Sequence, residues 1–438
     1  MSTVCRPCSW TRTTRFAGAS DMSRIVIVGG GIIGLCAAYY ATEAGLDVTL
    51  IERGSPDHDS CSLGNAGMIC PSHFIPFAAP GMVELGLKML PNPESPFALK
   101  PQLSTDWLDW NLKFVQHCTT AHVNRSAPLL RDLLLKSRSL YEELETALPQ
   151  GFGLEKRGLL MLCKTEEALS EEAHLAKQAT ELGIPADVLT PEALAKLEPG
   201  IRFDVAGGVY FPLDCHLTPQ RLITVLRDEL TRRGVTFLWN TEAKGFQKER
   251  DRIVAVQTSN GEVSGDEFVL AGGAWTGDVA RALGVYLPML AGKGYSQTLK
   301  SPRELPKICS ILVEARVAVT PMGETLRFAG TMELTGNDLS VNPARVRGIQ
   351  KSIPKYFPSF APEDFAETPV WSGLRPCSPD GLPYLGRTGK WTNVLVAAGH
   401  AMLGISQGPI TGMLLAELLV DKAPSVDIAL LSPDRYTK

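Results

Sequence analysis

The sequence predicts an α/β fold in which a Rossmann-like domain is joined to a second, α+β domain built on a mostly antiparallel sheet. Three observations predict it. A strand, a glycine run, a helix and a second strand follow one another between residues 25 and 52. A second glycine-containing segment follows an apolar strand near residue 400, and short alternating strands fill residues 286 to 370.

The first element is a βαβ unit with a glycine fingerprint. The apolar strand 25–28 leads into Gly29, which permits a tight turn, and Gly31, which lets the backbone approach a pyrophosphate at a helix N-terminus. Gly34 allows close packing of helix on strand, and Glu52, 23 residues after Gly29, can accept hydrogen bonds from ribose hydroxyls. This context favours dinucleotide binding over an ordinary turn, but the motif alone does not separate NAD from FAD.

The next hundred residues predict a loop, a long excursion and a helical region. Residues 60–68 are small and glycine-rich, as backbone close to a planar ligand must be, although a plain loop reads similarly. The Pro- and Gly-dense stretch 71–100 suggests an ordered excursion over the active site. Apolar residues at helical spacing over 107–115 and 129–148 predict a helical cap, with its aromatic residues in the core.

The remaining segments are again expected to contain both strands and helices. Strands are expected at 207–211, 236–239 and 268–271, a helix at 219–233, and a hairpin around Asn260-Gly261. After the strand 394–398, Gly404 begins an apolar helix whose N-terminus could stabilise negative charge on a reduced flavin.

We therefore expect a discontinuous domain organisation. Residues 22–75, 205–278 and 371–438 would form the nucleotide-binding domain, and residues 76–204 and 279–370 the substrate or cap domain. Residues 1–21, rich in Ser, Thr and Arg, are expected to be a disordered leader; translation from Met22 and a targeting peptide are the alternatives.

Composition excludes several classes of function. The net charge of −4 without a Lys/Arg stripe argues against nucleic-acid binding. We find no apolar run near the roughly 18 to 20 residues that span a bilayer, so no membrane span is expected. The ten cysteines are scattered except for Cys5 and Cys8, which fits a cytoplasmic location, and no metal site is expected.

Six segments together resemble the D-amino acid oxidase superfamily of FAD enzymes, and within it the bacterial D-amino acid dehydrogenases. They are Gly29 to Gly34 with Glu52, Gly64-Asn65-Ala66-Gly67, Ala78-Ala79-Pro80-Gly81, Lys293-Gly294-Tyr295-Ser296, Trp371 to Asp380, and Gly399-His400 with Leu403-Gly404. The resemblance spans residues 24 to about 435 and implies a FAD-binding Rossmann-like domain of the GR2 type. It also implies that the cofactor is FAD.

The resemblance assigns roles to single residues. Arg375 would pair with a substrate carboxylate, as a permanently charged guanidinium fork can; the alternative is a structural salt bridge. Tyr295 would donate its hydroxyl to the same carboxylate or be a core tyrosine. His73 departs from the family pattern and would shape the pocket or lie in an exposed loop, and His400 would be structural or tune the flavin.

The expected cofactor contacts form a larger set. They are Gly29, Gly31, Ile32, Ile33, Gly34, Glu52, Arg53, Ser62, Asn65, Ala66, Gly67, Met68, Ala243, Gly272, Trp275, Gly399, His400, Leu403, Gly404 and Ile405.

The implied activity is that of a flavoprotein oxidoreductase in amino acid catabolism. Hydride transfer from the CH-NH bond of a D-amino acid would give an imino acid, which hydrolyses to a 2-oxo acid and ammonia. A D-proline or D-hydroxyproline dehydrogenase that forms a cyclic imine, and a non-catalytic flavoprotein subunit, are the alternatives. A quinone or an electron-transfer protein is the candidate electron acceptor, which would suit a cytoplasmic enzyme peripheral to the inner membrane face.

Overall fold

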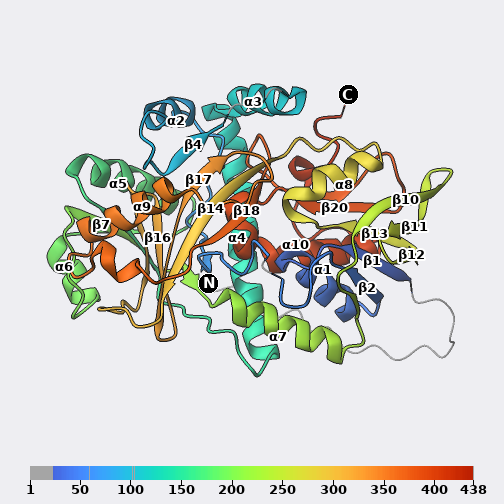
Figure 1. Ribbon diagram of the computed structural model, residues 1–438, viewed down its shortest axis with the longest axis horizontal. Coiled ribbons are helices and arrows are strands. Elements are labelled where there is room, and N and C mark those ends of the chain that lie inside the picture. The colour runs from blue at the N-terminus through green and yellow to red at the C-terminus, as the bar shows by residue number, and fades with distance from the viewer. Residues whose placement is uncertain (1–22, 59, 101, 103, 438) are drawn as a thin grey trace, which may run out of the picture.

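Two sheets lie side by side in the computed structural model, which describes residues 23–58, 60–100, 102 and 104–437 (Figure 1). A six-stranded sheet and its helices form one half, and a nine-stranded sheet forms the other. The predicted leader, residues 1–21, lies outside the described residues.

The six-stranded sheet is the predicted Rossmann-like element. Its order is β19 (Tyr384–Arg387), β20 (Val394–Ala398), β13 (Glu267–Leu270), β1 (Arg24–Val28), β2 (Asp47–Ile51) and β9 (Thr236–Leu238). All neighbours are parallel except β19 and β20. The strands are buried on both faces, which is why they read as continuous apolar runs.

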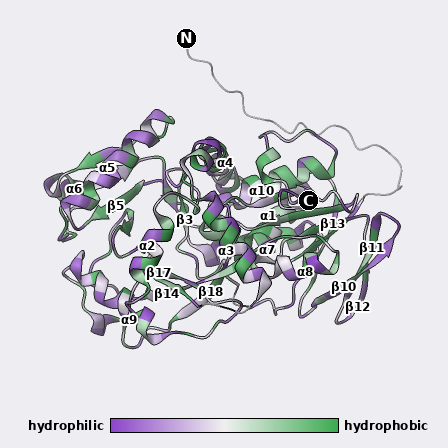
Figure 2. Cartoon of the chain, turned by 90° about the horizontal axis from the view of Figure 1, so that it is seen from above, coloured by the Kyte–Doolittle hydropathy of each residue, from purple (hydrophilic) through white to green (hydrophobic). Residues whose placement is uncertain are grey.

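Alternate residues of β1 face two different layers. Ile25 and Ile27 pack in the core shared with the helices α1 (Ile32–Glu43), α4 (Thr120–Ala147), α7 (Pro219–Arg232) and α10 (Gly404–Leu419). Val26 and Val28 pack in a core that includes Phe246 of the antiparallel sheet β10 (Ala243–Glu249), β11 (Arg252–Thr258) and β12 (Gly261–Ser264), beside α8 (Thr276–Ala282). In Figure 2 β13 is hydrophobic, whereas the three-stranded sheet at the edge of the molecule also carries hydrophilic residues.

Helices α1 and α10 approach each other through glycine. A Cβ on Gly412 would lie 2.4 Å from the Cys36 carbonyl oxygen, so only glycine permits this contact. The helical stretch Ala401–Leu419 is long and apolar enough to cross a bilayer, which corrects the expectation that no run comes near that length. However, 72% of it is buried inside the protein, as in a core helix.

The nine-stranded sheet is mostly antiparallel, as predicted. It runs β18 (Trp371–Cys377), β14 (Leu290–Leu299), β17 (Thr325–Leu334), β16 (Val317–Met322), β15 (Cys309–Leu312), β5 (Leu159–Cys163), β7 (Gly207–Phe211) and β6 (Asp187–Leu189), with β4 (Phe97–Leu99) on β17. Only the pairs β15 with β5 and β17 with β4 are parallel. Helices α5 (Glu166–Glu181), α6 (Pro191–Leu197) and α9 (Pro343–Ser352) accompany the sheet.

Three predicted segments have recognisable counterparts. The hairpin near Asn260 forms, because Thr258 of β11 pairs with Gly261 of β12. The excursion 71–100 is ordered and contains α2 (Met82–Met89) and β4. The predicted cap helices are α3 (Thr105–His117) and α4, and α4 joins the core with α1 and α10.

The proposed domain boundaries stay a prediction. Two strands that we placed in the nucleotide-binding segments, β7 and β18, pair in the nine-stranded sheet. A short ladder between β3 (Met68–Ile69) and β8 (Cys215–His216) connects the residue 60–70 loop with the chain after β7.

Candidate functional site

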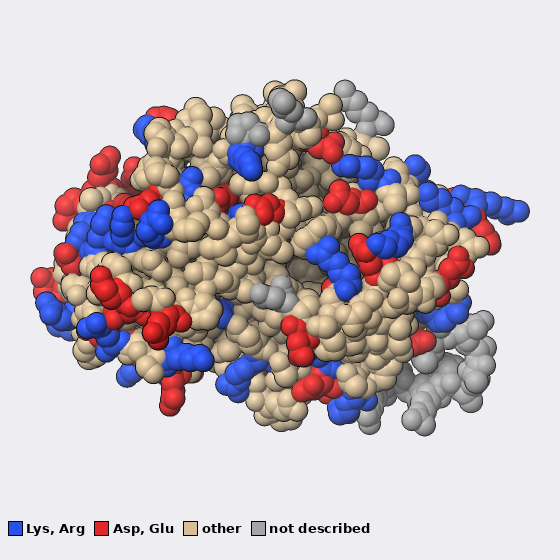
Figure 3. Space-filling view, in the orientation of Figure 1, with Lys and Arg blue, Asp and Glu red and all other residues tan. Residues whose placement is uncertain are grey.

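A cavity of about 1400 Å³ is lined by residues of both sheets and of the connections between them. One end is bordered by the β1–α1 turn and the other by strands β17 and β18. Figure 3 shows a hollow near the middle of the face, in the region between the two sheets of Figure 1. All predicted site residues line this cavity except Gly34, Gly67 and Gly399.

The β1–α1 turn requires its glycines for different reasons. Gly29 has a φ of +117°, and a Cβ there would lie 2.4 Å from the Ala271 carbonyl oxygen. A Cβ on Gly34 would lie 1.9 Å from the Gly29 carbonyl oxygen, so only glycine lets α1 pack this closely on the turn. A Cβ on Gly31 would meet only Ser62 Oγ, at 3.5 Å. The turn thus leaves room in front of the N-terminus of α1.

The N-terminus of α1 is prepared for an anion. Its N-cap residue, Gly31, has no side chain to cap it, and no acidic residue lies in its first turn. The Ile32 backbone N–H donates to Ser62 Oγ at 3.1 Å, while Glu52 accepts from the Gly30 N–H at 2.7 Å and the Gly54 N–H at 2.8 Å. The space in front of Gly31 and the positive end of the helix dipole fit a pyrophosphate, and Glu52 lies beside them for a ribose.

Next to Glu52, the cavity carries an aromatic and cationic pair. The guanidinium carbon of Arg53 lies 3.6 Å from the centre of a Trp275 ring. Gly272 and Ala243 line the same cavity. These flat, partly apolar surfaces suit the adenine end of a dinucleotide.

The loop before β3 and the start of α10 face each other across the cavity. Met68 accepts a hydrogen bond at its carbonyl from Ser406 Oγ at 2.9 Å, in the first turn of α10. Arg327 donates to the Leu63 carbonyl at 2.9 Å and the Asn65 carbonyl at 2.7 Å, and so pins the loop to β17. Sequence reasoning missed Arg327, because the loop and β17 are 262 residues apart.

His400 is placed as a structural residue. Its Nε2 lies 3.0 Å from Thr411 Oγ1, and burial lowers the pKa of His400 to about 3. Because the imidazole is neutral and its Nε2 is hydrogen-bonded to Thr411, it suits a structural or flavin-tuning role rather than that of a base. Gly399 and Gly67 have φ of +80° and +73°, so both serve turns behind the wall.

Arg375 presents its guanidinium to the cavity from β18. Nη1 donates to the Thr331 carbonyl at 2.8 Å, and a Cβ on Gly294 would lie 2.2 Å from that nitrogen, so the guanidinium lies directly over the Gly294 backbone. Burial lowers the pKa of Arg375. Among the described residues, no carboxylate lies within 4.0 Å to pair with it. A partly buried guanidinium that opens onto the cavity without a carboxylate partner fits a bound anion.

A bulge in β17 produces this arrangement. Lys293 pairs with Glu333 and Tyr295 with Gly330, so Thr331 and Met332 together oppose Gly294. Thr331 has a φ of +70°, which is rare for a β-branched residue. The bulge turns the Thr331 carbonyl toward Arg375. No local pattern in the sequence signals it.

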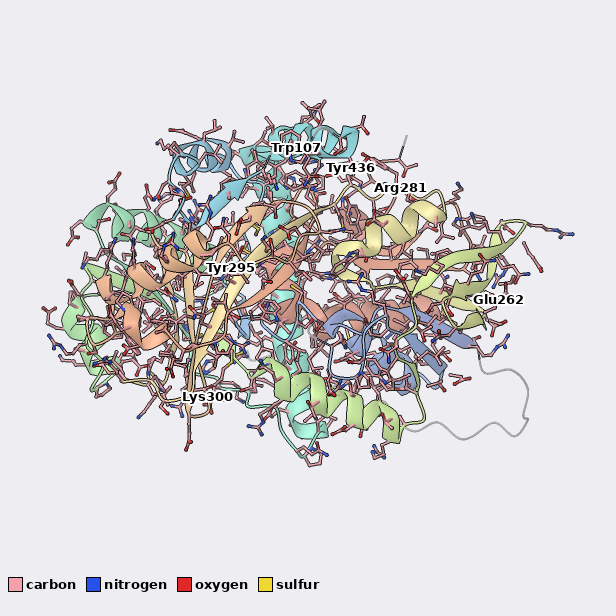
Figure 4. All side chains as sticks on the ribbon, in the orientation of Figure 1. Trp107, Glu262, Arg281, Tyr295, Lys300 and Tyr436 are labelled. Carbon is pink, nitrogen blue, oxygen red and sulfur yellow. The ribbon has the colours of Figure 1, made fainter. Side chains whose placement is uncertain are left out.

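Tyr295 is placed differently from the predicted carboxylate contact. Its hydroxyl donates to Glu333 Oε1 at 2.5 Å and accepts from the Asn342 N–H at 3.1 Å, and the residue is 1% exposed. Figure 4 shows it on β14 within the sheet. Because its single proton is used by Glu333, the geometry favours the core-tyrosine alternative, and we do not carry the substrate role further.

His73 faces the cavity instead of lying in an exposed loop. Its Nδ1 lies 3.0 Å from Ser72 Oγ, and burial lowers the pKa of His73 to about 4. One atom each of Cys70, His73 and Asp214 lies within 4.8 Å of the others, a spacing that would suit a metal ion. Asp214 instead accepts from Ser72 Oγ at 2.5 Å and from the Ser72 N–H at 3.1 Å, so we assign no metal here.

Comparison with known proteins identifies the family. A family model described as FAD dependent oxidoreductase matches residues 24–418. D-amino acid dehydrogenases of Granulibacter bethesdensis and Methylobacterium nodulans are 30% and 32% identical to the chain, over 94% and 95% of it and 99% of each relative.

Solved structures share the fold. Glycine oxidase from Geobacillus kaustophilus superposes with a TM-score of 0.76 at 23% identity, covering 95% of this chain and 100% of that one. L-proline dehydrogenase from P. horikoshii gives a TM-score of 0.69 at 18% identity, covering 95% of this chain and 98% of that one. At these identities the likeness shows the fold.

Proposed function

The chain belongs to the family of FAD-dependent oxidoreductases, and from that premise we propose that it oxidises the CH-NH bond of a D-amino acid. The product is an imino acid, which water hydrolyses to a 2-oxo acid and ammonia. The names of the relatives, D-amino acid dehydrogenase, support this substrate class.

The observation that carries the proposal is the guanidinium of Arg375. It lines the cavity without a carboxylate partner among the described residues, and it is held by the Thr331 carbonyl at 2.8 Å. A bidentate fork of this kind fixes a carboxylate in one orientation, so an amino acid bound by it presents its Cα in one direction.

The chain supplies binding and orientation. Arg375 holds the carboxylate, and the uncapped N-terminus of α10 places a partial positive charge beside the loop that ends at Met68. Apolar residues around the site exclude water, which strengthens the charged contacts. When bound, FAD supplies the hydride acceptor.

Anaerobic bleaching of the holoenzyme tests the proposal. Wild-type protein should lose its oxidised flavin absorbance with D-amino acids and keep it with L-enantiomers. Replacing Arg375 by Met removes at least two charge-assisted hydrogen bonds to the substrate, roughly 3 kcal/mol or about 100-fold in kcat/KM. Arg281→Met is the matched control, because Arg281 makes an exposed ion pair with Asp106.

The outcomes separate the alternatives. Bleaching by D-proline or D-hydroxyproline alone would indicate a cyclic imine as product. No bleaching by any amine, with flavin present, would refute the amino acid oxidation and favour the non-catalytic subunit.

For the electron acceptor we propose a quinone or an electron-transfer protein, with the enzyme at the inner face of the membrane. Exposed apolar side chains next to the cavity support this. Helix α2 has no buried residue, and Leu87 on it is 61% exposed; Leu112 and Val115 on α3 are 56% and 54% exposed. Leu87 and Val115 also line the cavity. Co-sedimentation with vesicles, lost in Leu87→Glu with Leu112→Glu, would check this placement.

A further inference from the structure

A chain of hydrogen bonds leads from the cavity to a buried carboxylate. His73 lines the cavity, and its Nδ1 lies 3.0 Å from Ser72 Oγ. Ser72 Oγ donates to Asp214 Oδ2 at 2.5 Å, and the Ser72 N–H donates to Oδ1 at 3.1 Å. Asp214 itself is 0% exposed, and Ser72 and His73 connect its carboxylate to the cavity.

The directions of these bonds fix the tautomer of His73. When Asp214 is ionised, the hydroxyl of Ser72 gives its one proton to Asp214, so the bond between Ser72 and His73 uses a proton on Nδ1. Nε2 then carries a lone pair. None of the described residues forms a hydrogen bond with Nε2, which leaves it available to a group in the cavity.

These three residues are linked to the start of α10, the helix whose N-terminus we expect to face the flavin ring. Cys70, three residues before His73, donates its N–H to Ser406 Oγ at 3.4 Å, and Ser406 Oγ donates to the Met68 carbonyl. Ser406 lies in the first turn of α10. His73 is therefore connected, through the segment from Met68 to Cys70, to the N-terminus of α10.

We propose that His73, Ser72 and Asp214 form a proton relay that takes one proton from the substrate ammonium group and so prepares the amine for oxidation. This inference rests on the proposed function, which requires a neutral amine. The ammonium proton goes to Nε2 of His73, the Nδ1 proton goes to Ser72 Oγ, and the hydroxyl proton goes to Asp214 Oδ2. The substrate keeps the electron pair of the broken N–H bond, and no electrons move between molecules in this step.

The acidities of the two ends suit transfer in this direction. Burial raises the pKa of Asp214 to about 7, whereas burial lowers the pKa of His73 to about 4. A proton accepted by the imidazole therefore passes on to the carboxylate. Cys70, Cys215 of β8, Cys309 of β15 and Arg138 of α4 are the titratable or charged groups that act on Asp214 or lie around it, and only Arg138 carries a permanent charge.

The test measures flavin reduction by D-alanine in anaerobic stopped flow from pH 6 to pH 10. Ser72→Ala and Asp214→Asn should reduce the limiting rate at pH 7 at least about 100-fold, which is the lower range for loss of a general base. Both should recover wild-type rates near pH 10, where the free amine is already neutral. Ser137→Ala, which alters a buried serine on α4 whose Oγ has no partner, is the matched control.

An infrared measurement gives a readout independent of turnover. At pH 8, reduction of the wild-type holoenzyme by D-alanine should add the band of a protonated carboxyl group. The band should be absent in Asp214→Asn. It should also be absent when dithionite reduces the wild type, because no ammonium proton is then delivered.

The outcomes distinguish the two proposals. Wild-type flavin that no D-amino acid reduces would overturn the proposed function and the relay together. Normal reduction of the wild type, with unchanged pH profiles in both variants and no carboxyl band, would overturn the relay alone. A loss of rate in the variants that persists at pH 10 would also overturn it, because that would indicate a structural defect.

Discussion

A single methyl group at Gly294 should disable substrate binding while leaving the fold and the cofactor site intact. In Gly294→Ala the new Cβ would lie 2.2 Å from Nη1 and 2.5 Å from Cζ of Arg375. Comfortable contacts need about 3.5 Å, so the guanidinium must move by roughly 1 Å or more. Because it is the end of a flexible side chain, it can move without displacing β14 or β18.

The magnitude follows from what Arg375 loses. The shift breaks its bond to the Thr331 carbonyl and misaligns the fork for a carboxylate. Hydrogen bonds to charged groups contribute about 1.5 to 3 kcal/mol, which corresponds to roughly 10- to 150-fold in affinity. We expect the Kd for a carboxylate substrate or inhibitor to rise by that factor, with the melting temperature changed little.

The assay is titration of the oxidised holoenzyme with a carboxylate inhibitor, followed by the flavin spectrum. Gly389→Ala is the control, because its Cβ would meet the end of another flexible side chain, Asp434, at 3.0 Å. Unchanged affinity in Gly294→Ala would refute the placement of Arg375 as the carboxylate anchor. Loss of bound FAD in Gly294→Ala would refute the claim that the change stays local.

Three further predictions concern stability and cofactor affinity. The pKa of Asp214 is raised from 3.8 to about 7, so its contribution to stability is full below about pH 4 and is lost as the pH rises to about 7. The loss amounts to at most about 4 kcal/mol. In Asp214→Asn the free energy of unfolding by urea should therefore fall less between pH 5 and pH 8 than it does in the wild type. In Glu52→Gln the amide NH2 group replaces one carboxylate oxygen, so it cannot accept from the N–H of Gly30 or Gly54. FAD binding should weaken about tenfold, measured by release of flavin fluorescence. Arg435→Met leaves Asp380 buried without its ion-pair partner at 2.7 Å and should cost about 3 to 5 kcal/mol in chemical denaturation; a normal midpoint would contradict this.

The parts of the fold that the sequence predicts well are those that local patterns encode. The unit β1–α1–β2 combines a strand, a tight turn and a helix within one stretch, so Gly29, Gly34 and Glu52 could be interpreted from spacing alone. The mostly antiparallel sheet that contains β14 to β17 could likewise be predicted, because short runs of alternating polar and apolar residues fill this part of the sequence.

The parts that could not be predicted depend on contacts between distant segments. Ser72 and Asp214 are 142 residues apart, and no sequence pattern near Asp214 predicts that its carboxylate is buried. The bulge at Thr331 depends on its pairing with β14, and the proton of Tyr295 is used by Glu333, 38 residues later. The strands β7 and β18 show the same limit, because a short apolar run does not reveal which sheet it joins.

The packing of α10 against α1 has a consequence for the chain during its synthesis in the cell. The ribosome completes α1 long before it completes β20 and α10, yet all three belong to the same half of the fold. A nascent chain that ends before Gly404 lacks the helix that covers α1 and faces the loop at Met68. The face of α1 that packs on α10 and the loop at Met68 therefore stay uncovered until α10 has been synthesised.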